Sequence, residues 1–160
     1  MSYESAKEHI KKYGLESHIM EFSTSSATVK EAAMTLKCSE AEIAKTLSFL
    51  VNDKPILIVT AGDQKIDNAK YKKKFNVKAT MIKAQDVENL IGHKVGGVCP
   101  FGINDGIDVY LDISLKRFTH VYPACGSGKS AIRLTIKELE LSSNYKEWVD
   151  VCKTIENINN

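Results

Sequence analysis

The sequence predicts an α+β fold: a single domain with a strongly curved, barrel-like mixed β-sheet that is flanked by helices. The predicted order is helices, hairpin, helix, strand, helix and then several strands, which is not the regular alternation of a doubly wound sheet. Segment 55–60 is apolar on both strand faces, which places it centrally in a sheet. The 160 residues, 43% of them hydrophobic, suit a compact domain with a real core. We expect one domain over 1–160, with a frayed tail over 156–160.

Bulk composition excludes several classes of protein. The formal net charge of +2 is too small to indicate a nucleic-acid-binding protein by charge alone. No apolar run reaches the ~18 residues that a membrane-spanning helix needs, and the N-terminus lacks a signal-peptide pattern. We expect a soluble, cytoplasmic protein that binds neither DNA nor a membrane. One group of lysines is interpreted as a solvated helix face: Lys65, Lys70, Lys72, Lys73 and Lys74.

Three Ser/Thr-x-x-Glu pairs mark the starts of the first helices. In each pair the hydroxyl caps an unpaired backbone amide and the glutamate reaches back to the start of the helix. The first helix should end near Gly14, the second should cover about 29–36, and the third should be short. The pairs are Ser5 with Glu8, Thr28 with Glu31, and Ser39 with Glu42.

A β-hairpin follows the third helix. Residues 44–51 have the alternation of a strand, 52–54 have the composition of a tight turn, and 55–60 form the return strand. Because side chains alternate between the faces of a strand, Lys45 should share one face with Leu47 and Phe49, and Thr46 should lie on the other.

The rest of the chain is predicted to contain short helices and strands. Asp67 caps one helix and Asn76 stops it, Gly92 closes another, and Thr135 with Glu138 caps a third. The last helix is predicted from its apolar spacing. The predicted helices cover 67–75, 85–91, a stretch after 135, and 145–155; the strands cover 77–82, 107–111, 119–124 and 130–134.

Lys45 is the first candidate for chemistry. A lysine at the start of an apolar strand face either extends its ammonium to the rim of the sheet or is held there for a reaction. The second candidate is the glycine- and proline-rich loop 93–102, which cannot form a regular helix or strand. Such a loop either presents backbone amides to a developing oxyanion or is a structural turn or bulge.

Segment 124–130 has the composition of a phosphate-binding loop but not its pattern. The motif needs a glycine where the chain has Pro123, and the following residues indicate a strand instead of a helix. We therefore reject nucleotide hydrolysis. A turn that contacts a ribose or phosphate and a plain hairpin turn both remain open.

Cysteine and histidine patterns give no established catalytic or metal motif. The cysteines at 38, 99, 125 and 152 form no CxxC pair, so we expect free thiols, no zinc and no other metal or cofactor. The four histidines fit no hydrolase or HExxH pattern. A pair such as Cys99 with His120 stays open as a nucleophile with its base.

Six short segments occur in a fixed order along the chain. They are VKEAA (29–33), IAKTL (43–47), AGDQKID (61–67), VGGVCPFG (95–102), VYLD (109–112) and ACG (124–126). Together they resemble the YbaK/EbsC family, the free-standing relatives of the editing domain inserted in bacterial prolyl-tRNA synthetases. The resemblance spans about residues 20–140, and the lysine strand and the Gly-Gly-x-x-Pro-x-Gly loop are its most specific parts.

The resemblance implies a trans-editing aminoacyl-tRNA deacylase, which hydrolyses the ester of a mischarged tRNA, such as a tRNA-Pro. It implies an active-site role for Lys45, contact with the acceptor end of the tRNA, and a curved mixed sheet. Whether an aminoacyl-tRNA synthetase is a second partner stays open. The substrate-binding residues implied by the matching strand, loop and turn are Thr46, Gly96, Gly97, Val98, Cys99, Pro100, Phe101, Gly102, Cys125, Gly126 and Ser127.

The identity of the edited amino acid and the group that acts as the base both stay open. Cys99 stands where many relatives carry serine or threonine, and the turn after Cys125 is unusually rich in glycine. Alanine, cysteine, serine and proline analogues are all small enough, and no protein base is evident. The alternatives are a non-catalytic module that binds tRNA or a synthetase, and a cysteine-dependent hydrolase or redox protein.

Overall fold

A six-stranded mixed sheet forms the centre of the molecule, which is described by a computed structural model over residues 2–156. Its strand order is β8-β6-β2-β3-β5-β9. The strands are β1 Ile19–Glu21, β2 Ile43–Val51, β3 Lys54–Ala61, β4 Gln64–Ile66, β5 Asp108–Asp112, β6 His120–Pro123, β7 Ser130–Ile132, β8 Leu134–Thr135, β9 Glu147–Val149 and β10 Cys152–Thr154. The helices are α1 Ser2–Lys11, α2 Val29–Leu36, α3 Asn68–Phe75, α4 Ala84–Ile91 and α5 Ile136–Ser142.

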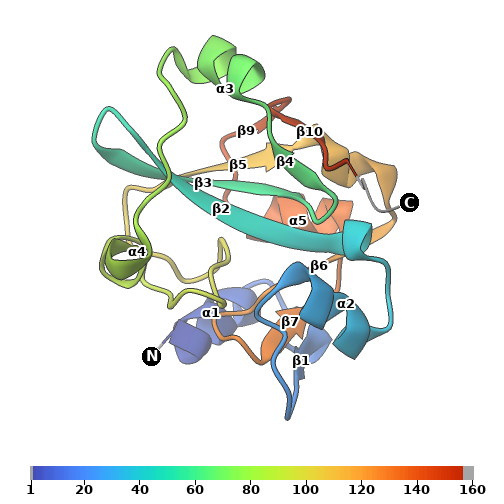
Figure 1. The fold of residues 1–160 in the computed structure, drawn as a ribbon. Coiled ribbons are helices and arrows are strands. Elements are labelled where there is room, and N and C mark those ends of the chain that lie inside the picture. Colours follow the sequence, from blue (N-terminus) through green and yellow to red (C-terminus); the bar gives the residue numbers. More distant parts are fainter. Residues whose placement is uncertain (1, 157–160) are drawn as a thin grey trace.

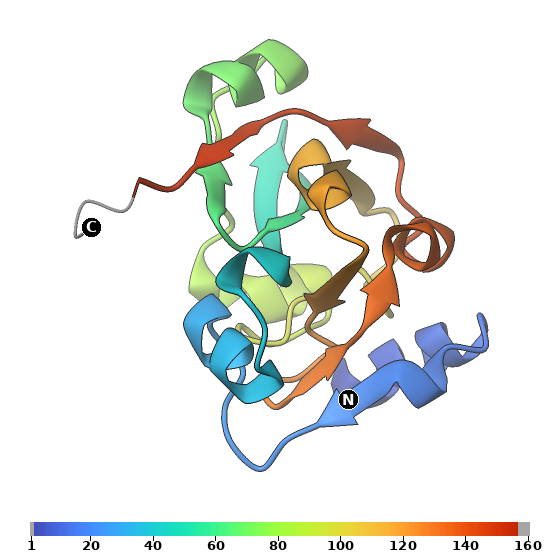
Figure 2. The same cartoon turned by 90° about the vertical axis from the view of Figure 1, so that its right-hand side faces the viewer.

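The sheet curls strongly, and helices lie around it (Figures 1 and 2). β2 pairs antiparallel with β3, whereas β3 with β5 and β5 with β9 are parallel. Two small antiparallel pairs, β1 with β7 and β4 with β10, flank the main sheet. Helices α1 and α3 lie at opposite ends of the molecule in both views. This confirms the predicted α+β fold with a curved mixed sheet.

The hairpin of β2 and β3 is confirmed. Residues Asn52 and Asp53 both have positive φ, as a tight two-residue hairpin turn requires, and the register runs from Val51 opposite Lys54 to Ala44 opposite Ala61. Strand β3 is buried almost throughout and has β-neighbours on both sides, as its two apolar faces predicted.

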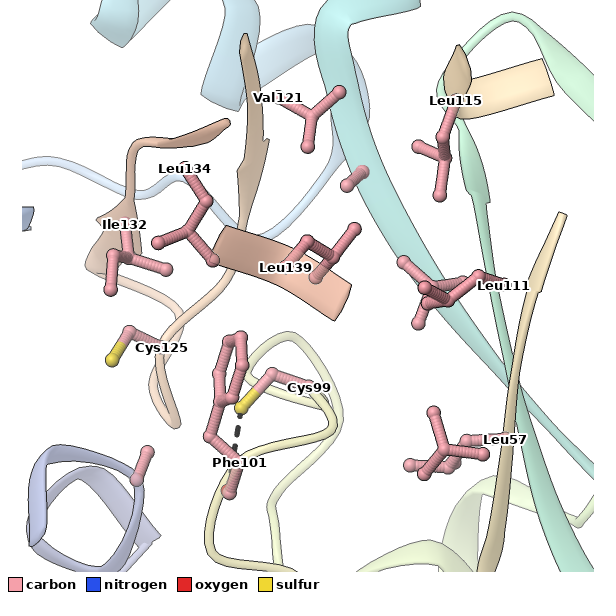
Figure 3. Packing of buried hydrophobic residues seen from close by; sticks show 14 of the residues in the cluster. Leu57, Cys99, Phe101, Leu111, Leu115, Val121, Cys125, Ile132, Leu134 and Leu139 are labelled. Carbon is pink, nitrogen blue, oxygen red and sulfur yellow. Dashed lines mark hydrogen bonds between the residues drawn. The ribbon is translucent and has the colours of Figure 1, made fainter. Parts of the chain in front are cut away.

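Two apolar clusters lie on opposite faces of this hairpin. The larger contains Leu57 and Val59 of β3 together with core residues from the loop after α4 and from α5, as Figure 3 shows for Phe101 and Leu139. The smaller contains Phe49, with Leu47 and Val51 packed against it, and is covered by α3. The predicted face of Lys45, shared with Leu47, Phe49 and Val51, is therefore the one toward the smaller cluster.

Four of the predicted helices form between the predicted caps. Thr28 and Thr135 make complete capping boxes for α2 and α5, and the Asp67 carboxylate accepts two backbone N–H groups at the start of α3. Asn76 and Gly92 end α3 and α4 in the left-handed conformation. Ser39 and Glu42 box a short 3₁₀ helix, Glu40–Glu42, that leads into β2.

Four predictions of local structure were wrong in whole or in part. Ser5 does not cap α1 but lies inside it, and its hydroxyl donates to the Ser2 carbonyl. Segment 77–82 is not a regular strand, because only Met81 forms a bridge, to Phe49. Segment 145–155 is not a helix but β9 and β10, which complete the sheet beside β5 and pair with β4. Predicted strand 130–134 is divided into β7 and β8, which pair with different neighbours.

The tail predicted to fray lies outside the described residues from 157 onward. Within 2–156, no helix is long and apolar enough to cross a bilayer.

Candidate functional site

A cavity of about 280 Å³ opens along β2. α2, α4, β6 and the loop after α4 enclose it, and most of its lining is apolar. Among the lining residues that the structure describes, Lys45 carries the only charged side chain. The lining residues are 26–29, Ala32, 43–48, Met81, Ile82, Ala84, Val87, Val95, Gly96, Val98, Tyr122, Ala124, Ser130 and Ala131.

Lys45 is half-buried at this cavity. Its Nζ donates a long hydrogen bond of 3.5 Å to the Gly62 carbonyl, in the turn between β3 and β4. Burial lowers the pKa of the Lys45 ammonium, and the nearby Asp63 and Cys152 oppose that shift only in part. The Asp63 carboxylate is bound by both terminal nitrogens of Arg117, at 2.6 and 3.0 Å. No side chain in 2–156 therefore pairs directly with the Lys45 ammonium.

Gly62 holds its carbonyl in place by close packing. A Cβ at this position would lie 2.0 Å from the Glu40 carbonyl oxygen and 2.8 Å from Cγ1 of Val29. Only glycine allows the turn to approach the start of α2 and the 3₁₀ helix Glu40–Glu42 this closely. The position of the Lys45 ammonium thus depends on the contact of the turn with these two helices.

The cavity lies at a gap in the pairing of β2. On the edge away from β3, β6 pairs with β2 only at Ile43 and Ala44. Further along the same edge, the Ile82 N–H donates to the Ser48 carbonyl and the Leu50 N–H donates to the Thr80 carbonyl. Between these contacts, 45–47 have no described strand neighbour on this edge, and the cavity occupies that space.

The loop 95–98 forms the wall opposite β2. Gly96 has a φ of +94°, and a Cβ there would lie 3.0 Å from the Ala27 Cβ. A Cβ on Gly97 would lie 2.5 Å from the Ser127 nitrogen, so Gly97 packs the loop against the turn 126–128. Ser127 in turn hydrogen-bonds the Ser130 hydroxyl, and Ser130 lines the cavity.

The structure brings four of the sequence-predicted site residues to the cavity: Lys45, Thr46, Gly96 and Val98. The others lie behind it. Cys99, Phe101 and Cys125 are fully buried in the larger core cluster (Figure 3). Gly102 and Gly126 pack against the backbone of α1, and Pro100 lines a different cavity beside that helix. Gly97 and Ser127 connect the loop and the turn, as described above.

Sequence reasoning missed two walls of the cavity. One is formed by 26–29 and Ala32, at the start of α2; the other includes Ile82 and Val87, next to and within α4. The capping box at Thr28 identified the start of α2, but no residue pattern indicated that this helix faces β2. Ser48 on β2 was also missed as a lining residue.

The geometry does not favour thiol chemistry. Burial raises the pKa of the Cys99 thiol far above its ordinary value and raises the pKa of Cys125 to about 12, so neither is a ready thiolate. The histidine beside Cys99 is His93, with Nε2 3.5 Å from Sγ, and not His120. No group of three metal-ligating side chains occurs within 2–156.

The sequence matches the model of the aminoacyl-tRNA editing domain over residues 24–141, which include the whole cavity wall. The chain belongs to this family. It is 52% identical over 157 residues to the uncharacterized protein YwhH of Bacillus subtilis, covering 98% of this chain and 100% of YwhH. This confirms the resemblance to the YbaK-like editing domains.

Further relatives connect the editing-domain fold with prolyl-tRNA synthetases. A proline–tRNA ligase of Caldicellulosiruptor bescii is 33% identical over 92 residues, which are 56% of this chain and 15% of the ligase. The chain thus corresponds to a small part of that enzyme. A crystal structure named as a candidate trans-editing enzyme for prolyl tRNA synthetase superposes with a TM-score of 0.85 at 25% identity, covering 95% of this chain and 97% of that one.

Proposed function

We propose that this protein is a trans-editing aminoacyl-tRNA deacylase, which hydrolyses the ester between a small wrong amino acid and the 3′ end of a tRNA. A tRNA-Pro is the first candidate, because the editing-domain relatives include proline–tRNA ligases. The observation that carries the proposal is Lys45: its ammonium is the single charge in the described lining of a mostly apolar cavity, in a chain of the editing-domain family.

The reaction needs few protein groups because an aminoacyl ester is already activated. Water attacks the ester carbonyl, the tetrahedral oxyanion collapses, and the ribose oxygen leaves and takes up a proton. The Lys45 ammonium anchors the terminal phosphate or stabilises the carbonyl oxygen as it becomes negative. The described lining contains no histidine or carboxylate that could act as a base. A neighbouring ribose hydroxyl or the substrate's own side chain supplies that role in our proposal.

The cavity acts as a second sieve in this account. A synthetase gains only ~1–3 kcal/mol from a methylene or hydroxyl difference, so a separate pocket must remove its errors. Walls of alanine, valine and isoleucine side chains suit a small, uncharged amino-acid side chain, and a charged one would find no countercharge besides Lys45.

The tRNA backbone would meet the outer surface, where α3 is one candidate. Two of its lysines are already used: Lys70 pairs with Asp150, and Lys74 pairs with Glu147. Lys72 and Lys73 are exposed and form no ion pair within the described residues. A contact through these two predicts only a modest salt dependence of binding.

The test is a panel of mischarged tRNAs, each incubated with the protein while loss of the ester is followed over time. The proposal expects accelerated release of one or a few small amino acids and no release of the correct one. The alternative is a module that only binds tRNA or a synthetase. It expects binding to charged tRNA with an unchanged ester half-life, a result that would overturn the deacylase.

Alkylation of the thiols distinguishes the proposed deacylase from a cysteine-dependent enzyme. A cysteine-dependent enzyme would lose its activity when its thiols are alkylated in the folded state. We expect full retention, because Cys99 and Cys125 are buried and their pKa values are raised.

A further inference from the structure

The open edge of β2 offers a complete set of backbone hydrogen-bonding groups to a ligand. In an antiparallel pair, alternate residues point their N–H and C=O groups toward the partner strand and away from it. The Ser48 carbonyl and the Leu50 N–H both bond to 80–82, on the edge opposite β3. Even-numbered residues of β2 therefore point away from β3. By this alternation, both the N–H and the C=O of Thr46 face the gap in the pairing.

The same position carries hydroxyl groups without a described partner. Oγ1 of Thr46 is buried and makes no hydrogen bond within 2–156. Ser48, two residues along on the same face, is 6% exposed, lines the cavity and makes no side-chain hydrogen bond within 2–156. Buried polar groups are normally paired, so the unpaired Thr46 Oγ1 at the cavity indicates a polar ligand atom.

The charges of the cavity lining determine the orientation of a ligand that has both a cationic and an anionic group. The cavity has no carboxylate in its described lining, so a cationic ligand group must be held by carbonyl and hydroxyl oxygens. On this edge the Thr46 carbonyl and the hydroxyl groups of Thr46 and Ser48 are available, because the Ser48 carbonyl already accepts the Ile82 N–H. Lys45 lines the same cavity from the other face of the strand, and its ammonium suits a phosphate or a developing oxyanion instead.

We infer that the aminoacyl group binds to Thr46 as a single added strand residue. Its α-ammonium donates to the Thr46 carbonyl, and its ester carbonyl accepts from the Thr46 N–H. Two residues of a hydrogen-bonded antiparallel pair exchange this same set of two bonds. The inference rests on the proposed function, and it makes the Thr46 amide an oxyanion donor and the free amino group a requirement for binding.

Binding of a stable analogue tests the inference without turnover. The probe is 3′-deoxyadenosine carrying alanine through an amide at the 3′ position, compared with its N-acetyl form. NMR of ¹⁵N-labelled protein should show the Thr46 amide signal moving and its hydrogen exchange slowing with the free-amine probe. The N-acetyl probe should bind about tenfold more weakly or worse, as expected for losing a hydrogen bond from a charged group. Equal affinity of the two probes, or an unmoved Thr46 amide, would overturn the inference.

A backbone substitution supplies the kinetic test. Replacing Thr46 by its α-hydroxy acid removes the N–H and keeps the side chain; the same replacement at Thr119, in an exposed position, is the matched control. We expect the deacylation rate to fall about tenfold or more for Thr46 only, at unchanged melting temperature. A rate within twofold of wild type in a folded variant would contradict the oxyanion role.

Failure of this inference is distinguishable from failure of the proposed function. If N-acetylalanyl-tRNA and alanyl-tRNA are hydrolysed with equal acceleration over their spontaneous rates, the two hydrogen bonds to Thr46 are refuted and the deacylase activity stands. If the free-amine probe binds through Thr46 but no charged tRNA is hydrolysed, the two hydrogen bonds are supported and the deacylase activity is refuted.

Discussion

The Lys45 ammonium is partly buried and yet has no carboxylate partner, and the residues around it explain why. Arg117 binds the nearest carboxylate, Asp63, and this contact lowers the pKa of Asp63 and keeps it from closing on the ammonium. The Gly62 carbonyl is a neutral partner that orients Nζ without cancelling its charge. Such a group is available to a phosphate or to an oxyanion.

The lowered pKa of Lys45 predicts the pH dependence of deacylation. If the ammonium form is the active one, the enzymatic rate divided by the spontaneous rate is constant at low pH. It falls as pH rises through the Lys45 pKa, which lies below the ordinary lysine value. A Lys45→Arg variant stays charged to higher pH and should shift any such fall upward. A wild-type ratio that rises steadily with pH would point to a neutral amine acting as a base.

Because the Thr46 hydroxyl has no hydrogen-bond partner within 2–156, its removal should raise stability and lower activity. Thr46→Val keeps the shape and removes a buried group without a partner, so the free energy of unfolding should rise by about 1 kcal/mol. Deacylation should weaken, because a ligand contact is lost. Urea unfolding and single-turnover rates measure the two quantities. A destabilised variant would show that the hydroxyl is satisfied in the native state.

At the scale of the residue, strand alternation is short-range and strict, and it directed sequence reasoning to Lys45, which lines the cavity. It also found Gly96, because a glycine-rich loop restricts what the backbone there can do. It placed Cys99 and Cys125 at the ligand, whereas both lie in the core (Figure 3). Loop residues next to a site can point either way, and only the packing of α1 behind them decides the direction.

Among the elements, the turn between β3 and β4 and helix α2 must fit closely to set the site. Gly62→Ala would force the turn away from the Glu40 carbonyl and should cost about 1–3 kcal/mol of unfolding free energy. It should also lower the deacylation rate, because the Gly62 carbonyl orients Lys45.

Gly14→Ala is the matched control for this effect. Gly14 has a φ of +70° and open space around it, so alanine strains the backbone without a clash. It should reduce stability and leave the rate unchanged. If both variants lose stability and neither loses activity, the turn does not position Lys45.

Helix α1 is held against the loop after α4 by His9, which makes stability depend on pH. Nδ1 of His9 accepts the Gly102 N–H, so Nε2 carries the proton and donates to the Ser142 carbonyl. Burial lowers the pKa of His9 in the folded state, and likewise that of His93. The unfolded chain then binds more protons below its own histidine pKa of about 6.5.

The free energy of unfolding should be highest above pH ~6.5 and should decrease as pH falls toward the folded-state pKa values. Each pKa unit of lowering contributes about 1.4 kcal/mol at most. His9→Gln should be less stable at pH 7.5 and show a shallower decrease on acidification. A slope equal to that of wild type would rule out His9 as a contributor.

The element predictions succeeded where capping signals are local and failed where distant pairing decides. Asp67 and Gly92 fix their helices through bonds within a few residues. Segment 145–155 has apolar residues at helical spacing, but Val149 and Cys152 pack into the smaller cluster from β9 and β10. Pairing with β5 and β4 outweighs the helical pattern, and no local signal in the sequence announces it.

At the scale of the whole molecule, the curl of the sheet creates the site. It brings α2, the loop 95–98 and the region of Met81 around the one stretch of β2 that β6 does not cover (Figures 1 and 2). The family and fold class could be inferred from six separated segments, because each lies in a helix start, strand, turn or loop that this geometry constrains. The gap in the pairing of β2 could not be inferred from the sequence, because it depends on where β6 turns away from β2.

The most direct test of the account is single-turnover release of the edited amino acid by Lys45→Met. Methionine nearly matches the lysine stem in a half-buried position and removes only the charge, so the fold should remain intact. Lys137→Met, at an exposed position of α5, is the matched control. We expect a rate lowered about a hundredfold or more for Lys45→Met and nearly unchanged for Lys137→Met. A folded Lys45→Met protein that releases the amino acid within twofold of the wild-type rate would contradict it.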